Sequence, residues 1–357
     1  MSDGRYPCAI LGAGGYIGQQ FARLLADHPR FAPPLLVGRA RGRPRTLEEA
    51  WTLAEAPPPG LARRPLVPAS PARLSARGVR VVFSALPSGI AGPIEDELVR
   101  RGIHVFSNAA DHRLDPGVPL LIPEVNEPHL ALADGRRAGR GLLVTNPNCS
   151  TTGLVLALAP VVGLLRPRAV HVTTFQALSG AGYPGVPSLA IVDNVVPYIP
   201  EEERKMAEET VRLLGRTRGR SVVRASFPVL ASCARVATRD GHLEAVTVEA
   251  TRRPSTADLE RAWTAFDPLA GRLLPTAPHP PIERTTAPDR PQPLRDRWAG
   301  RPARARGMAA VVGRVRWEPP FLRFFVLTHN AVRGGAGGSV LNAELADETG
   351  RLGVLEA

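Results

Sequence analysis

The stretch YPCAILGAGGYIG, residues 6–18, decides how this chain folds. Its first half is a short apolar run, as expected of a strand buried on both faces of a parallel sheet. Its second half is rich in glycine and leads into the amphipathic segment QQFARLLADH. Glycine here can serve helix packing alone, but a strand, a turn and a helix in this order favour a pyrophosphate held by backbone N–H groups. The predicted dinucleotide-binding residues are Gly12, Ala13, Gly14, Gly15, Tyr16, Ile17 and Gly18.

The first part of the chain continues to alternate strands with helices. Further apolar runs lie at 34–37, 79–86 and 104–108, with helical patterns between them. This alternation is typical of parallel βαβ units. We therefore predict an α/β fold whose first domain, residues 1–145, is a Rossmann-type doubly wound sheet. The proline-rich residues 56–76 are expected to form a surface loop.

Beyond residue 145 the strand–helix alternation ends. Helical patterns come first, and stretches that alternate like half-buried strands follow. This order predicts an α+β domain with a mostly antiparallel sheet over 146–330, in which 267–306 form a long irregular segment. The helices are expected at 150–165 and 200–214, and the strands at 241–250, 308–317 and 321–328.

The composition narrows the possible partners. The chain has 357 residues, enough for two domains, and a formal charge of +12 from 45 Lys and Arg against 33 Asp and Glu. The cations are scattered, and the 5% of aromatic residues do not interleave with them as in a stacking surface, so no nucleic-acid partner is expected. No apolar run approaches the ~20 residues that span a bilayer, and the start does not resemble a signal peptide, so no membrane partner is expected.

Three cysteines, Cys8, Cys149 and Cys233, are too few and too odd in number for a disulfide framework, which favours a reducing cytoplasm. No CxxC pair or clustered His/Cys spacing supports a metal site. Lys205 is the only lysine, and the other 44 basic residues are arginine. In a chain so strongly biased toward arginine, a retained ammonium group suggests a specific role.

The end of the second strand bears on the choice of cofactor. An acidic residue that would hold the ribose of NAD is expected ~20 residues after the glycine loop. The sequence there is VGRAR, residues 37–41, which has no carboxylate and places Arg39 to meet a 2′-phosphate. The sequence therefore favours NADP over NAD.

A candidate nucleophile lies where the second domain begins. The segment NPNCSTT, residues 146–152, places Cys149 at a helix N-terminus, where the helix dipole favours a thiolate. The alternative is a small buried residue, as expected for Cys8. A thiolate needs a distant histidine, and His242 lies at a turn into a strand. By contrast His28, His129 and His279 each adjoin proline and are expected to be solvated.

Six segments in order along the chain form a recognisable set: SNAADHR (107–113), NPNCST (146–151), TFQALSGAG (174–182), DNVVP (193–197), RPQP (290–293) and 330–344. Together they resemble the aspartate-β-semialdehyde dehydrogenase family, most closely its archaeal and fungal-like branch. The resemblance covers nearly the whole chain. Two departures stand out: Gly14 replaces the threonine of the family's GATGxVG loop, and the VGRAR segment replaces a serine-rich loop while keeping the arginine.

The resemblance implies roles for individual residues. It makes Cys149 the nucleophile and His242 the acid/base. Backbone N–H groups at the helix start, together with Asn148, are expected to hold the oxyanion. Glu202 and Lys205 would form a substrate and phosphate pair; the alternative for these two is a surface ion pair. It also implies a C-terminal helix, roughly 334–350, that returns to the first domain as part of a segment of about 331–357. The other implied residues are Gln176 for substrate orientation, Arg235 for the substrate carboxylate, Arg113 for phosphate, and Ser84, Leu86, Pro87, Ser179, Gly180 and Asn330 in the cofactor pocket.

The expected activity is the NADPH-dependent reductive dephosphorylation of L-aspartyl 4-phosphate to L-aspartate 4-semialdehyde through a cysteine thioester. Inorganic phosphate is then a substrate of the reverse reaction, and a homodimer or homotetramer is expected. Other possibilities are an acyl-CoA reductase such as a malonyl-CoA reductase, an enzyme for a close aspartate analogue, and a catalytically idle binding protein.

Overall fold

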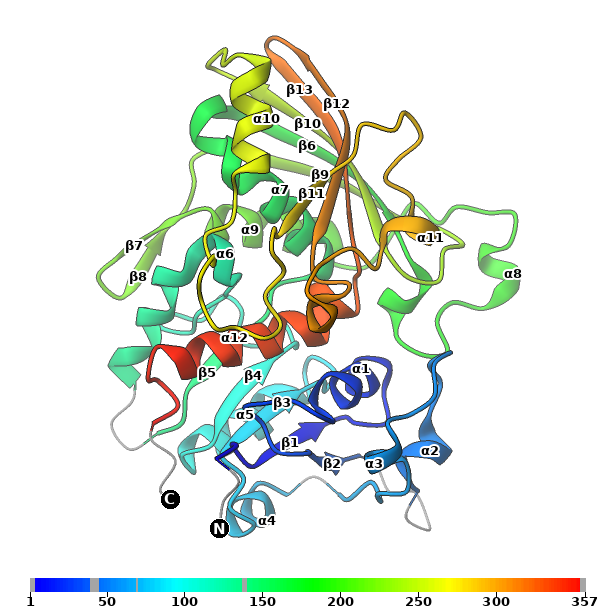
Figure 1. Cartoon of the computed structure of the whole chain (residues 1–357), viewed down its shortest axis with the longest axis vertical. Coiled ribbons are helices and arrows are strands. Elements are labelled where there is room, and N and C mark those ends of the chain that lie inside the picture. Colours follow the sequence, from blue (N-terminus) through cyan, green and yellow to red (C-terminus); the bar gives the residue numbers. More distant parts are fainter. Residues whose placement is uncertain (1–3, 39–44, 69, 137–139, 354–357) are drawn as a thin grey trace.

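The first sheet has five parallel strands in the order β2-β1-β3-β4-β5. The computed structural model describes residues 4–38, 45–68, 70–136 and 140–353, and Figure 1 shows this sheet in the lower half of the molecule. The winding direction reverses between β1 and β3, and ligands bind outside the carboxyl ends of parallel strands at such a point. The strands are β1 (Cys8–Leu11), β2 (Leu35–Val37), β3 (Val81–Ser84), β4 (His104–Ser107) and β5 (Leu143–Thr145).

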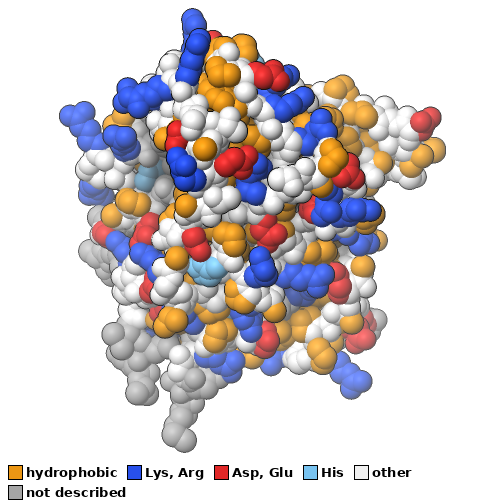
Figure 2. All heavy atoms as spheres, turned by 45° about the horizontal axis from the view of Figure 1, so that its top comes forward, with side chains coloured by type: hydrophobic (Ala, Val, Ile, Leu, Met, Phe, Trp, Pro, Cys, Tyr) orange, Lys and Arg blue, Asp and Glu red, His pale blue; other side chains and the backbone are white. Residues whose placement is uncertain are grey.

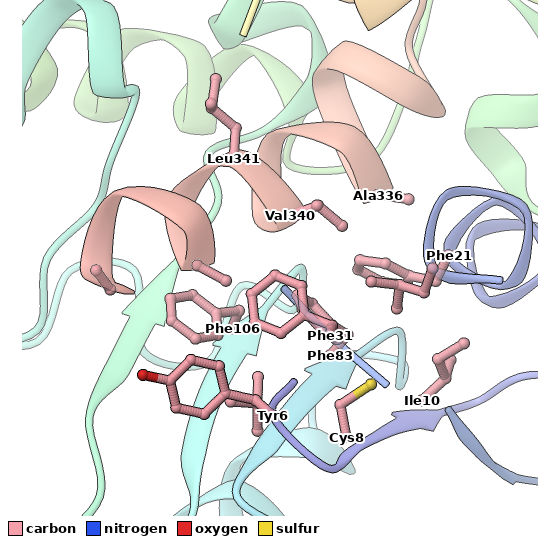
Figure 3. Close-up of a cluster of buried hydrophobic side chains, with 14 of the residues drawn as sticks. Tyr6, Cys8, Ile10, Phe21, Phe31, Phe83, Phe106, Ala336, Val340 and Leu341 are labelled. Atoms are coloured by element: carbon pink, nitrogen blue, oxygen red, sulfur yellow. The ribbon is translucent and has the colours of Figure 1, made fainter. Parts of the chain in front are cut away.

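Helices cover both faces of this sheet, which confirms the predicted doubly wound arrangement. On one face α1 and the C-terminal α12 share a core with β1, β3 and β4, and Figure 3 shows Val340 of α12 above Phe83 and Phe106. On the other face Leu74 of α4 and Leu98 of α5 pack on the sheet. The helices are α1 (Tyr16–Leu25), α2 (Leu47–Ala50), α3 (Pro59–Ala62), α4 (Pro71–Ala76), α5 (Ala91–Arg100), α6 (Pro123–Asn126) and α12 (Gly337–Glu348).

The second sheet has six strands in the order β11-β12-β13-β10-β6-β9. Three of its five pairings are antiparallel, and β11 with β12 and β6 with β9 run parallel, so the sheet is mostly antiparallel as predicted. A separate hairpin is formed by β7 (Arg216–Arg218) and β8 (Ser221–Val223). The strands are β6 (Pro167–Gln176), β9 (Val229–Arg235), β10 (His242–Ala250), β11 (Ile282–Arg284), β12 (Ala310–Glu318) and β13 (Phe321–Thr328).

One face of the second sheet packs on α7 (Cys149–Leu165). This helix is apolar on nearly all sides, so it has to be enclosed, and α9 and α10 enclose it. The indole N–H of Trp263 in α10 donates to the carbonyl oxygen of Ala157 at 2.8 Å. The remaining helices are α8 (Ser188–Ile191), α9 (Glu202–Leu213), α10 (Thr256–Thr264) and α11 (Pro293–Asp296).

The chain returns from the second sheet to the first through residues 332–336 and α12. Arg333 and Glu124, each 1% exposed, form two hydrogen bonds of 2.9 and 2.7 Å. At the far end of α12 the Tyr6 hydroxyl donates to Asp347 Oδ1 at 2.8 Å. The C-terminal helix is therefore attached to the first sheet by polar contacts as well as by its apolar face.

Three details differ from the expectations. Residues 56–76 contain the short helices α3 and α4 as well as loop. His28 is fully buried against Glu344 Oε1 at 2.9 Å, and His129 is buried beside Asn126, so neither is solvated. A π-type turn at 332–336 delays the start of α12 to Gly337. Among the described residues, no helix is long and apolar enough to cross a membrane.

Candidate active site

The ends of three strands bring the predicted residues to one end of the second sheet. Gln176 ends β6 and Arg235 ends β9, and these two residues are paired in register. His242 begins β10, which runs antiparallel to β6, so it comes to the same end. The N-terminus of α7 completes the group with Cys149.

Cys149 and His242 are in direct contact. The sulfur lies 3.2 Å from Nε2 of the imidazole. The other ring nitrogen, Nδ1, accepts the backbone N–H of Ala177 at 3.0 Å. Because Nδ1 is an acceptor, the neutral ring carries its proton on Nε2 and presents it to the sulfur.

Burial keeps both partners uncharged. Desolvation, with a smaller contribution from the positive charge of Arg235, lowers the pKa of His242 to about 3. Desolvation also raises the pKa of Cys149 to about 12, with a second contribution from the Glu202 carboxylate. The expectation of a thiolate favoured by the helix dipole is therefore wrong for this state of the site, because loss of hydration outweighs the helix terminus and the nearby arginines.

Asn148 caps the helix that presents Cys149. Its Oδ1 accepts the N–H groups of Ser150 and Thr151 at 3.0 and 3.1 Å. Its Nδ2 donates to Glu202 Oε1 at 2.9 Å, the same oxygen that accepts Gln176 Nε2 at 2.9 Å. Asn148 and Gln176 are thus held by one buried carboxylate at the start of α9.

The positive charges of the two predicted anion-binding arginines, Arg113 and Arg235, act against the rise in the pKa of Cys149. Arg113 Nη1 donates to Glu209 Oε1 at 2.9 Å and Nη2 to the carbonyl oxygen of Asn108 at 2.8 Å. Arg235 Nη1 donates to the Ala177 carbonyl oxygen at 2.8 Å.

Lys205 lies one turn after Glu202 on α9 and is half-buried. Within the described part of the chain, its ammonium group makes no hydrogen bond or ion pair, with Glu202 or with any other residue. The carboxylate of Glu202 instead accepts the two amides. The simple surface ion pair considered from the sequence is therefore not formed.

The glycine loop opens into a pocket of about 870 Å³ at the switch point of the first sheet. Gly12 has a φ of +76°, and a Cβ there would lie 2.7 Å from the Ala85 carbonyl oxygen, so the tight turn requires glycine. A Cβ on Gly18 would lie 2.1 Å from the Gly12 carbonyl oxygen. The shape and position suit a dinucleotide at the N-terminus of α1. Its lining includes Gly12, Gly14, Gly15, Val37, Gly38, Arg45, Leu86, Pro87 and Tyr183.

Hydrogen bonds connect this loop to the turn before His242. The Tyr16 hydroxyl donates to Asp240 Oδ1 at 2.7 Å. The next residue, Gly241, donates its N–H to Asn330 Oδ1 at 2.9 Å, and Asn330 Nδ2 donates to Ser179 Oγ at 2.9 Å. These hydrogen bonds therefore link the glycine loop to the turn that carries His242.

Comparison with known proteins identifies the family. Residues 7–133 match the model for the semialdehyde dehydrogenase NAD binding domain, and residues 158–333 match that for the semialdehyde dehydrogenase dimerisation domain. The chain belongs to the semialdehyde dehydrogenase family. This result confirms the resemblance found from the sequence motifs.

Individual relatives of this family member agree. It is 46% identical to an aspartate-semialdehyde dehydrogenase of Archaeoglobus fulgidus, over 96% of this chain and 98% of the relative. It is 40% identical to a malonyl CoA reductase (NADP) of Metallosphaera sedula, over 96% and 97% of the two chains. The crystal structure of aspartate semialdehyde dehydrogenase with NADP from Candida albicans is 33% identical, with a TM-score of 0.84 over 96% of this chain and 98% of that one.

Of the residues expected to bind the cofactor of this semialdehyde dehydrogenase, Leu86 and Pro87 line the pocket at the glycine loop. Ser84, Ser179, Gly180 and Asn330 are not part of that lining. Ser84 is fully buried at the end of β3, and the pocket is lined by the residues that follow it. Ser179, Gly180 and Asn330 lie beside His242, where a Cβ on Gly180 would lie 3.2 Å from the imidazole. Arg39 falls outside the described residues, and Arg45 lines the described part of the pocket.

The sequence reasoning missed Glu209 and Gly334. Glu209 is one of several acids in an amphipathic helix, and no local pattern separates it from its exposed neighbours. Gly334 packs directly on the nucleophile: a Cβ there would lie 2.6 Å from Cys149 Cβ and 2.7 Å from its Cα. The glycine-rich run RGGAGG, residues 333–338, was the available signal for such a close approach.

We predict that Gly334→Ala lowers the free energy of unfolding by about 1–3 kcal/mol, because the new methyl group has to displace backbone. Turnover should fall at the same time, because the displaced backbone carries Cys149. Urea denaturation and steady-state assays measure the two effects.

The matched control is Gly163→Ala in the same helix as Cys149. A Cβ there meets no atom within 4 Å, so the change should stabilise the helix by about 0.5–1 kcal/mol without affecting turnover. A Gly334→Ala protein as stable and active as Gly163→Ala would contradict the packing argument.

Proposed function

We propose that this chain is an NADP-dependent aspartate-semialdehyde dehydrogenase. It converts L-aspartyl 4-phosphate to L-aspartate 4-semialdehyde and inorganic phosphate. The observation that supports this most directly is the 3.2 Å contact between Cys149 Sγ and His242 Nε2, with two arginines nearby and a dinucleotide pocket alongside. The names of the archaeal and fungal relatives support the same reading.

NADPH would occupy the pocket at the glycine loop, with its pyrophosphate at the N-terminus of α1 and its adenosine end toward Val37 and Gly38. When bound, it supplies the hydride. Arg39, and Arg45 at the lining of the pocket, are the cations proposed to meet its 2′-phosphate.

Cys149 attacks the acyl carbon, the bond from that carbon to the phosphate oxygen breaks, and a thioester forms. His242 already carries a proton on Nε2 and its Nδ1 is engaged by Ala177, so the ring has no free site for the thiol proton. That proton therefore leaves on the departing phosphate. After hydride reaches the thioester carbon, the carbon–sulfur bond breaks to release the aldehyde. The Nε2–H of His242 donates to the leaving sulfur, which regains a proton from solvent.

The surrounding residues position the substrate. Arg235 would bind its carboxylate, and Gln176 would orient the acyl group from the end of β6. Glu202 holds Asn148 and Gln176 in place by its two hydrogen bonds. Arg113 and Lys205 supply positive charge for the phosphate.

We also propose that residues 1–145 with the segment from about 331 onward form the NADP-binding domain, and that 146–330 form the catalytic and dimerisation domain. The close packing of α12 on the first sheet supports this division. Three free cysteines fit a reducing compartment, the cytoplasm.

An exposed apolar arm, residues 183–198, supports a homodimer, which could pair further into a tetramer. Leu189 is 94% exposed, Tyr183 68% and Tyr198 66%, although large apolar side chains are usually covered. Figure 2 shows hydrophobic side chains on the lobe at the right, where α8 lies in Figure 1. The arm is tied to the site, since Arg235 and Val196 exchange backbone hydrogen bonds of 2.8 and 3.1 Å.

We predict reduction of L-aspartyl phosphate with NADPH, read as loss of absorbance at 340 nm, and phosphate-dependent oxidation of the aldehyde in reverse. Cys149→Ser should abolish both reactions while NADP still binds. The same assay with malonyl-CoA tests the second activity, since one relative is a malonyl CoA reductase. If the enzyme reduces malonyl-CoA but not L-aspartyl phosphate, the proposed function is wrong and the chain is a malonyl-CoA reductase.

Lys205→Arg should lower kcat/KM for the acyl phosphate by at least tenfold, about 1.4 kcal/mol on the transition state. A guanidinium is longer and differently shaped than the ammonium it replaces. The melting temperature should hardly change, because the ammonium holds no partner among the described residues. Arg204→Lys on the same helix is the control, and equal kinetics in the two variants would refute a role for Lys205.

Leu189→Arg should convert the oligomer to monomers in light scattering, because it places a charge in the apolar interface. Leu273→Arg is the control, because this leucine is 80% exposed but lies outside the arm. An unchanged mass for Leu189→Arg would exclude the arm as the interface, and the mass of the parent protein distinguishes dimer from tetramer.

A further inference from the structure

Two buried carboxylates of α9 hold Asn148, the residue immediately before Cys149. Glu202 Oε1 accepts its side-chain Nδ2 at 2.9 Å, and Glu209 Oε2 accepts its backbone N–H at 2.7 Å. The two glutamates are seven residues apart, so they lie on the same face of the helix. They are 7% and 2% exposed.

Glu209 also reaches the predicted phosphate subsite. Its second oxygen, Oε1, accepts Arg113 Nη1 at 2.9 Å, so one carboxylate bridges the backbone before the nucleophile and the guanidinium. Arg113 is anchored on its other side by the Asn108 carbonyl oxygen at 2.8 Å. Because both contacts fix the direction of the guanidinium, the free N–H groups of Arg113 keep one orientation relative to Cys149.

We propose that Glu209 is a positioning residue for the reaction. It holds the nucleophile and the phosphate-binding arginine at a set separation. Glu209 does not contact the reacting atoms itself; it acts through Asn148 and Arg113. This inference rests on the proposed function, in which the Cys149 sulfur displaces phosphate. If Glu209 only stabilised the fold through a salt bridge, it would need Arg113 as its partner. It would not also need to accept the backbone N–H of Asn148.

The test is Glu209→Gln, which keeps the size of the side chain. Its amide oxygen can still accept the Asn148 N–H, but its NH₂ group then faces Arg113 Nη1, donor against donor. We expect kcat to fall at least tenfold and the KM for the acyl phosphate and for inorganic phosphate to rise. The KM for NADP should stay the same, because the dinucleotide pocket does not involve α9.

Glu208→Gln is the matched control. It makes the same charge change one residue away, where the side chain pairs with Arg204 on the surface. If Glu209 has only a structural role, Glu209→Gln should have a lower melting temperature. Its folded protein should then show the same kcat and the same KM for the acyl phosphate as Glu208→Gln. That result would overturn the proposal. If Glu209→Gln does not fold, Glu209→Asp replaces it in the test. Aspartate keeps the charge but is too short to reach both Asn148 and Arg113. A lower kcat and a higher KM for the acyl phosphate, with an unchanged KM for NADP, would then support the positioning role.

Alkylation of Cys149 by iodoacetamide separates this inference from the proposed function, because it needs no substrate. With Glu209→Gln we expect the rate at Cys149 to change at least threefold relative to Glu208→Gln. A parent enzyme that does not use acyl phosphates would refute the function, while this altered alkylation rate would still support the positioning role. An active parent with equal alkylation rates and equal kinetics in both variants would refute the positioning role alone.

Discussion

The close approach of residue 334 to Cys149 is the contact on which the site depends. The start of α7 can lie against the return segment only because position 334 has no side chain. The same segment carries Arg333, whose buried pair with Glu124 joins it to α6, the helix before the first sheet's last strand. A buried pair of this kind gives little net stability but strongly disfavours arrangements in which either partner is left alone. The contacts that fix the relative position of the two sheets therefore lie next to Cys149.

The chemistry of the site follows from dehydration. The imidazole of His242 is fully buried, and desolvation disfavours the charged forms of both the ring and the Cys149 thiol. The ring proton lies on Nε2 because Nδ1 accepts the backbone N–H of Ala177. An anionic substrate brings its own charge into this region and meets cationic side chains already held in place. Such preorganised charge is more effective where water is absent.

The sequence predicted those features of the site that depend on residues close together in the chain. The glycine loop, Cys149 at a helix start and His242 at a strand start all depend on neighbours in the sequence, and the structure has them in those places. The burial of His28 was missed because its partner, Glu344, lies more than three hundred residues away. Glu209 was missed for the same reason, since its partners Asn148 and Arg113 come from other elements. The thiol pKa was misjudged because a helix dipole is visible in a sequence, whereas the depth of burial is not.

The half-buried, unpaired ammonium of Lys205 has a practical consequence. Amine-directed reagents usually modify many surface lysines, and the product is a mixture. In this chain they have a single side-chain target, and it lies on the helix that carries Glu202 and Glu209. A fluorophore, spin label or crosslinker introduced through lysine chemistry would therefore report from α9 without any engineered cysteine.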